Sequence, residues 1–194
     1  MPVYVVTGFL FYCIINAFTP GPGNILALNT VTNYGLKKGR PLFSGIFAGY
    51  YVVQALCAIF VFGVSSFLPD ILKILKYVGA VYIAWLAVHI AVSKPDISSD
   101  SGSASFTKGF MLQFVNIKIY MFGITALTGY ITDYSTSLGI LLLFEMIIAT
   151  IGTIATITWI GLGILIKRYY LKYYRIINII LALMLAECIY SILK

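Results

Sequence analysis

Residues 16–28, NAFTPGPGNILAL, place two prolines and two glycines inside a stretch that is otherwise apolar. In a helix interior each proline costs about 3 kcal/mol and each glycine about 1 kcal/mol. Pro20 and Pro22 lack amide hydrogens, so carbonyls one turn earlier lose their helical partners. Asn24 can cap a second half-helix running from Ile25, whose free amides and dipole attract an anion. The stretch therefore predicts either a structural kink or a binding site made of broken backbone.

Two ionisable side chains lie deep inside other apolar stretches. Lys118 and Glu145 are each about nine residues from the nearer end of their stretch, or about 14 Å along a helix. In a hydrocarbon core about 30 Å thick these depths nearly meet, so a Lys118–Glu145 pair is geometrically compatible. Glu145 is then either a neutralised structural carboxylate or a carrier of a proton or a partner of an ammonium group. Asn116 borders a second polar interruption, NIK at 116–118.

The composition requires a lipid environment. Of the 194 residues, 61% are apolar and 10% are charged, against about 45–50% and 25% in soluble domains. The stretch 42–66 carries no charged residue, and 134–166 and 176–193 carry one each. Because about 20 apolar residues cross a bilayer, the chain is expected to be an all-α integral membrane protein. The net charge of +7 lies in short loops, which indicates no nucleic-acid partner.

The apolar pattern predicts six transmembrane helices, at about 3–34, 42–66, 71–93, 109–132, 136–166 and 175–193. The N-terminus lacks the basic region of a secretory signal, so it is expected to remain as the first span. Six spans place nine basic residues on one side, namely Lys37, Lys38, Arg40, Lys94, Lys108, Lys167, Arg168, Lys172 and Arg175. By the positive-inside rule this side is cytoplasmic, with both termini outside the cell (plasma or inner) membrane.

A polar central segment, 94–108, divides the chain into two groups of three spans. An odd number of spans in each half gives the halves opposite orientations, as inverted repeats require. The first span of each half also carries a polar interruption, at 19–24 and at 116–118. We therefore expect one transmembrane domain over 1–194, with repeat one at about 1–93 and repeat two at about 109–194.

Cofactor chemistry is not expected. Cys13, Cys57 and Cys188 form no CxxC, which argues against a disulfide framework or a zinc site. A membrane thiol–disulfide electron carrier remains an alternative, although it needs a cysteine pair in facing helices. A metal-ion transporter is a further alternative, although only Glu145 and Glu187 offer hard ligands well inside the spans. Asn16, Asn29 and Gln54 are expected to join helices by hydrogen bonds.

The chain resembles the LysE/RhtB family of amino-acid exporters. TPGPGNILAL and the following GLKKGRPLFSGIFAGYYV (35–52) are similar to the family's PGP break and its basic, glycine-rich loop. LKYVGAVYIAWLAV (75–88) resembles its third-helix pattern. The family usually has Asn-Pro-Lys near the start of its fourth helix, whereas QFVNIKIYMF (113–122) keeps Asn116 and Lys118 but has Ile117 in place of proline. Whether this helix breaks is therefore open.

The resemblance implies a secondary active exporter of amino acids or related metabolites, driven by the proton gradient and not an enzyme. We expect the substrate carboxylate to meet the half-helix start at Gly23 and Asn24. Its ammonium would approach Glu145, until a proton from outside displaces it. The expected partners are the amino acid, protons and the bilayer, and homo-oligomerisation is left open. No metal is expected, and the predicted substrate-binding residues are Pro20, Gly21, Pro22, Gly23, Asn24, Asn116, Lys118 and Glu145.

Overall fold

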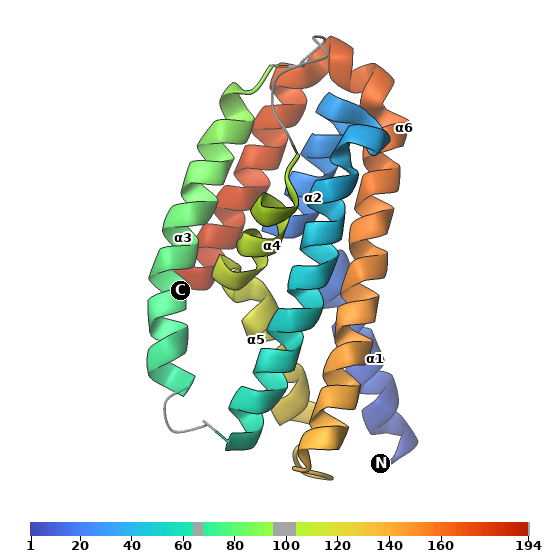
Figure 1. Cartoon of the computed structure of the whole chain (residues 1–194), viewed down its shortest axis with the longest axis vertical. Coiled ribbons are helices and arrows are strands. Elements are labelled where there is room, and N and C mark those ends of the chain that lie inside the picture. Colours follow the sequence, from blue (N-terminus) through green and yellow to red (C-terminus); the bar gives the residue numbers. More distant parts are fainter. Residues whose placement is uncertain (64–67, 95–103, 194) are drawn as a thin grey trace.

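The computed structural model describes residues 1–63, 68–94 and 104–193, and these fold as an elongated bundle of helices (Figure 1). No strand occurs among them. The elements in chain order are α1 (Val3–Phe18), α2 (Pro22–Gly63), α3 (Leu68–Val92), α4 (Phe106–Val115), α5 (Ile117–Tyr130) and α6 (Leu138–Leu193). The side chains of 68–72 lie outside the description, as does Lys194.

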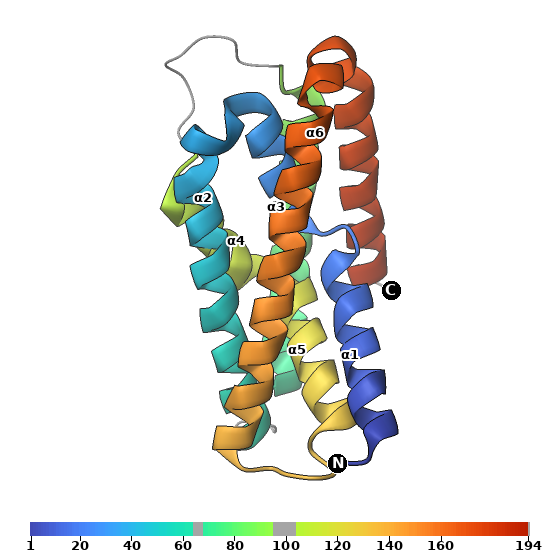
Figure 2. The same ribbon diagram turned by 90° about the vertical axis from the view of Figure 1, so that its right-hand side faces the viewer.

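Two of the helices contain a sharp kink. In α2 the kink is at Gly35, whose φ of 78° and ψ of 172° suit a residue without a Cβ atom. In α6 it is at Tyr173, with φ −121° and ψ 25°. At both kinks the chain turns back at the same end of the bundle (Figure 2). The N-terminus and the α5–α6 connection lie at the opposite end, so the bundle has two distinct ends.

Helix length alone does not separate the six expected spans. Three described helices, Pro22–Gly63, Lys73–Val92 and Leu138–Leu193, are long and apolar enough to cross a membrane. Four spans result if α4 and α5, bent by 55°, are taken as one. The count is lower than expected because α2 and α6 each join two expected segments across a kink. In addition, the segment 3–34 is interrupted, which leaves α1 too short to span alone.

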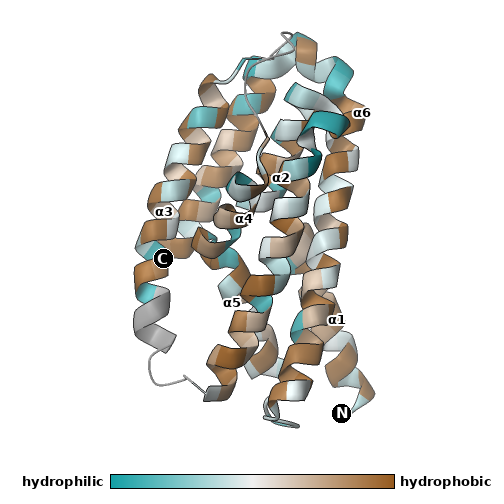
Figure 3. Cartoon of the chain, viewed as in Figure 1, coloured by the Kyte–Doolittle hydropathy of each residue, from teal (hydrophilic) through white to brown (hydrophobic). Residues whose placement is uncertain are grey.

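Hydrophobic residues, drawn in brown, recur along the helices of the bundle (Figure 3). Val81, Val92 and Leu165 are 72%, 70% and 75% exposed. Exposed apolar surface of this extent marks contact with a membrane or a partner protein. With the apolar helices, it makes this a multi-pass protein embedded in a membrane.

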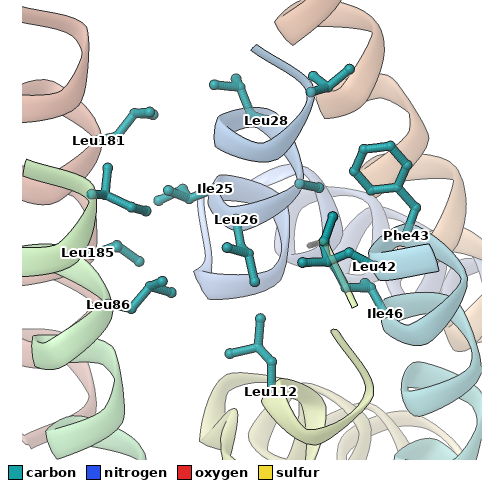
Figure 4. Close-up of a cluster of buried hydrophobic side chains, with 14 of the residues drawn as sticks. Ile25, Leu26, Leu28, Leu42, Phe43, Ile46, Leu86, Leu112, Leu181 and Leu185 are labelled. Atoms are coloured by element: carbon teal, nitrogen blue, oxygen red, sulfur yellow. The ribbon is translucent and has the colours of Figure 1, made fainter. Parts of the chain in front are cut away.

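The first part of α2 lies at the centre of the bundle. Every residue from Pro22 to Thr32 is buried. Ile25, Leu26 and Leu28 pack among side chains of α3, α4, α6 and the later part of α2, including Leu42, Phe43, Ile46, Leu86, Leu112, Leu181 and Leu185 (Figure 4). Protein therefore covers the segment that follows the proline-rich interruption, as irregular backbone at membrane depth requires.

Glycines bring the main chains of α2 and α4 into direct contact. A Cβ atom added at Gly45 would overlap the carbonyl oxygen of Phe106 and lie 2.9 Å from the amide nitrogen of Phe110. One added at Gly109 would overlap the carbonyl oxygen of Leu42. The spacing of small residues in GIFAG thus serves close helix packing.

This contact leads to the first prediction. Gly45→Ala forces two backbones apart, and such overpacking typically costs about 1–3 kcal/mol of stability. We expect a lower midpoint of thermal unfolding in detergent. Gly161→Ala is the matched control, because a Cβ there meets nothing within 4 Å and alanine favours helix. Equal midpoints for the two variants would contradict the packing role of Gly45.

Candidate functional site

The chain between α1 and α2 is broken about halfway along the bundle (Figure 2). Helix α1 ends at Phe18, Thr19 is extended with ψ of 140°, and α2 begins at Pro22. The break therefore falls at TPG, as the two prolines predict. Pro22 takes the first helical position, where its missing amide hydrogen and fixed φ are tolerated. The first-turn hydrogen bond of α2 runs from the amide of Ile25 to the carbonyl of Gly21, at 2.9 Å.

Four successive carbonyls at the break, from Ala17 to Pro20, each accept a hydrogen bond from a side chain. The donors come from α2, α5 and α6. The bonds are Asn24 Nδ2 to Ala17 O (3.0 Å), Trp159 Nε1 to Phe18 O (3.2 Å), Lys118 Nζ to Thr19 O (2.9 Å) and Lys118 Nζ to Pro20 O (3.0 Å). Because hydrocarbon offers no donors, these bonds are what allows the break to exist there.

The role of Asn24 differs from the sequence expectation. The expected half-helix starts at Ile25 with Asn24 as its cap, whereas α2 starts at Pro22 and contains Asn24. The Asn24 amide group donates backward to the end of α1, and its Oδ1 accepts a hydrogen bond of 2.8 Å from Thr156 Oγ1 of α6. Asn24 therefore joins three helices at the break.

A second break separates α4 from α5 and answers the question that Ile117 leaves open. Asn116, with φ −84° and ψ 84°, lies between the two helices, whose axes differ by 55°. Its carbonyl accepts from the amide of Ile119 at 3.1 Å. The extended ψ of one residue is sufficient to end the helix, so the break forms without proline.

Lys118 connects the two breaks. It is the second residue of α5, and its ammonium group lies at the carbonyl end of α1. The C-terminus of a helix carries a partial negative charge and the N-terminus a partial positive one. The partially negative carbonyl end of α1 and the partially positive amino end of α5 thus lie next to each other.

An open cavity of about 890 Å³ reaches this place. Its lining includes Thr19 and Pro20, whose carbonyls bind Lys118. It also includes the basic residues Lys73, Lys76 and Lys118 and the acidic residue Glu187. Lys73 and Lys76 belong to the early turns of α3, near the end of the bundle that carries the N-terminus (Figure 1). The volume lies within the range of small-molecule sites, about 300–1,000 Å³.

A much smaller void, of about 20 Å³, shares Lys118 with the cavity as a lining residue. It is lined by the remaining residues of the two breaks and by neighbours that include Gly21, Gly23, Asn24, Gln113, Asn116 and Lys118. Gln113 covers the start of α2, since its Nε2 is 3.1 Å from the position of a Cβ at Gly23. Both polar atoms of Gln113 and the Oδ1 of Asn116 have no hydrogen-bond partner. Gly23 and Asn24 therefore line the small void, and Lys118 lines both the void and the open cavity.

Buried polar side chains close the opposite, basic end of the bundle. Tyr170 is fully buried and donates to Asn33 Oδ1 at 3.2 Å or to Asn178 Oδ1 at 3.0 Å. Asn178 Nδ2 in turn donates to the carbonyl and the hydroxyl of Ser93, at 2.9 and 3.1 Å. This network links α2 and α6 with the end of α3, beyond the buried part of the site.

The Lys118–Glu145 pair is not formed in the structure. Glu145 is fully buried in α6, and neither of its carboxyl oxygens has a hydrogen-bond partner. It lines neither of the two cavities. Similar depth does not place two side chains on facing sides of their helices, and the carbonyls of the first break take up the lysine ammonium instead. The other seven predicted residues gather at the two breaks.

Sequence reasoning missed three partners of this site. Gln113 precedes the second break, and Thr156 and Trp159 lie on α6 opposite the first. A polar residue three positions before Asn116 is a signal that points to Gln113. Thr156 and Trp159 carry no local signal, because their role depends on which face of α6 meets the break.

Thr156 supplies the second prediction. Thr156→Val keeps the shape of the side chain but leaves the buried Oδ1 of Asn24 without its donor, which costs about 1–3 kcal/mol. We expect a lower midpoint of thermal unfolding in detergent. The control is Thr158→Val, two residues along α6, where the exposed hydroxyl bonds only to Ile154 O. A Thr156 variant as stable as the Thr158 variant would show that the Asn24 bond contributes nothing.

Comparison with known proteins gives the family. The sequence model described as "LysE type translocator" matches residues 14–187. The chain is 38% identical over 189 residues to a Salmonella typhimurium (strain LT2) protein named "Cysteine/O-acetylserine efflux protein", covering 97% of each. Proteins of the same name from Shigella flexneri and Escherichia coli O9:H4 (strain HS) are 36% and 37% identical, covering 97% and 95% of each chain. No solved structure matches. The chain belongs to the LysE type translocator family.

Proposed function

We propose that the protein is a secondary active exporter of amino acids, with L-cysteine and O-acetyl-L-serine as its first candidate substrates. The efflux function in the names of its relatives supports this. The observation that carries the proposal is the Lys118 ammonium group bound to the Thr19 and Pro20 carbonyls beside an open cavity. An ammonium group of the protein already occupies a site that an amino acid's ammonium fits.

The substrate binds as a zwitterion between the two breaks. Its ammonium replaces that of Lys118 at the carbonyl end of α1, where the helix dipole favours a cation. Its carboxylate meets the released Lys118 and the amino end of α5, where an anion is favoured. Pro20 and Lys118 make the contacts from the cavity. Broken helices that present such ends to a substrate recur in transporters.

The residues around the void form the second part of the site. Gly21, Gly23, Asn24 and Asn116 become reachable once Lys118 leaves the carbonyls, since Lys118 lines both the void and the cavity. The unpartnered polar atoms of Gln113 and Asn116 are then available for the substrate carboxylate. Pro22 contributes by fixing the break rather than by contact.

The transport cycle alternates access between the two ends of the bundle. The cavity extends toward the end where α3 begins, and the Ser93–Tyr170–Asn178 network closes the other end. The proton gradient drives export. Rocking of one half of the chain against the other opens the closed end.

The proposed topology has six membrane-crossing segments in two inverted repeats, about 1–93 and 109–194, within one domain. One broken segment near the start of each half supports this division. The nine basic residues of the kinks and connections face the cytoplasm, with both termini outside. A cysteine introduced as Lys172→Cys should react with an impermeant maleimide in inverted vesicles only. Reaction only in right-side-out vesicles would reverse the orientation.

The function is tested by transport into inverted membrane vesicles. We expect a gradient that is acidic inside to drive accumulation of labelled L-cysteine and O-acetyl-L-serine. Because both charged groups are bound, cysteamine, which lacks the carboxylate, and mercaptopropionate, which lacks the amine, should compete poorly. Absence of gradient-driven accumulation across a panel of labelled amino acids would overturn the proposal.

Lys118 tests the binding site itself. Lys118→Met removes the ammonium group and leaves two carbonyls of the break without their charged donor, each such bond being worth about 1.5–3 kcal/mol. We expect transport to fall to background while the chain still reaches the membrane. Lys94→Met, at an exposed position after α3, removes the same charge away from the site and should transport normally. Normal transport by the Lys118 variant would remove this residue from the site.

A further inference from the structure

A second polar cluster, which lines neither cavity, lies where α2, α5 and α6 meet. Gln54 of α2 and Glu145 of α6 both reach over Gly123 of α5. A Cβ atom added at Gly123 would overlap Gln54 Oε1 and lie 2.8 and 2.9 Å from the two oxygens of Glu145. The absence of a side chain at Gly123 thus leaves a slot in which three oxygen atoms converge.

None of these polar atoms has a partner. Both oxygens of Glu145 and both polar atoms of Gln54 lack hydrogen bonds, and both side chains are 0% exposed. Lys118 is bound at the first break instead, and among the described residues no cation pairs with the carboxylate. An unpaired charge buried at this depth is very costly. A proton on Glu145 removes the negative charge of the carboxylate. It also gives one Glu145 oxygen a hydrogen that it can donate to another oxygen in the slot.

We propose that Glu145, Gln54 and Gly123 form a proton-binding site, separate from the substrate cavity, in which the protonated Glu145 donates a hydrogen bond to Gln54 Oε1. The inference rests on the proposed proton-coupled export and names the group that holds the proton. The proton passes from water on the outer side to one Glu145 oxygen, and later from that oxygen to water on the inner side. Because Glu145 lines neither cavity, the proton and the substrate do not compete for one contact. Their coupling runs through the conformational change.

The surroundings of the carboxyl group favour a proton over a metal cation. The titratable groups that interact with it are the Cys13 thiol from α1 and the Cys57 thiol and Tyr50 phenol from α2. All three are ordinarily uncharged at neutral pH. Divalent cations such as Ca²⁺ and Mg²⁺ take six or more oxygen ligands. The slot over Gly123 offers three.

The test uses the full chain in proteoliposomes that contain a pH-sensitive dye, with reduced L-cysteine as the substrate. In wild type, substrate movement should drive a countermovement of protons that is unchanged when choline replaces sodium. Glu145→Gln keeps the shape of the protonated carboxyl, so exchange of labelled for unlabelled substrate should persist. Its substrate-driven proton signal should be lost, and its exchange rate should no longer depend on pH.

Gln54→Leu removes only the acceptor of the proposed hydrogen bond. Net hydrogen-bond energies of about 0.5–1.5 kcal/mol predict that the pH profile of transport shifts to lower pH by up to about one unit. A merely structural role of Gln54 would lower the rate without moving the profile. Asp133→Asn, which changes an exposed acid in the α5–α6 connection, is the control and should behave as wild type.

The outcomes separate the two proposals. If wild type transports no amino acid, the proposed function fails, and this inference fails with it. If wild type transports but Glu145→Gln keeps its substrate-driven proton signal, the proton site is wrong while the export function stands. Transport that requires sodium and ignores pH would likewise overturn the proton assignment.

Discussion

The structure depends on satisfying a short run of backbone carbonyls inside a membrane. The prolines between α1 and α2 remove the amide donors that a continuous helix would provide, and lipid offers no replacement. Side chains from three helices therefore converge on Ala17–Pro20, with the Lys118 ammonium at the last two carbonyls, those of Thr19 and Pro20. This requirement explains why the segment after the break is buried on all sides, and why α5 must begin beside it.

The two breaks differ in how far the sequence foretells them. Two prolines and two glycines make the first break predictable, because no helix tolerates them together. The sequence marks the second only as a polar interruption at 116–118, and without a proline it leaves open whether the helix breaks at Asn116. The all-helical class and membrane location follow from composition. The sharp kinks at Gly35 and Tyr173, where the backbone angles are not helical, do not follow from composition.

The Lys118–Glu145 pair shows why depth alone does not give contacts. Counting residues from a helix end gives a position along the membrane normal, but the direction of a side chain around the axis depends on packing. Lys118 points to the first break and Glu145 to the slot over Gly123. The sequence identifies Gln54 as a polar residue in a stretch without charges, but it does not predict that Gln54 lies beside Glu145. Partners of this kind become visible only once the faces of α2, α5 and α6 are known.

The contact of Gly45 with α4 and of Gly109 with α2 places main chain directly on main chain. Backbone atoms cannot change rotamer as side chains do, so the distance between the two helices cannot change by side-chain repacking. Packed protein interiors also compress little. The two helices therefore keep a fixed separation at this point while their ends remain free to tilt. If one half of the molecule turns against the other, the glycine crossing is the natural fulcrum.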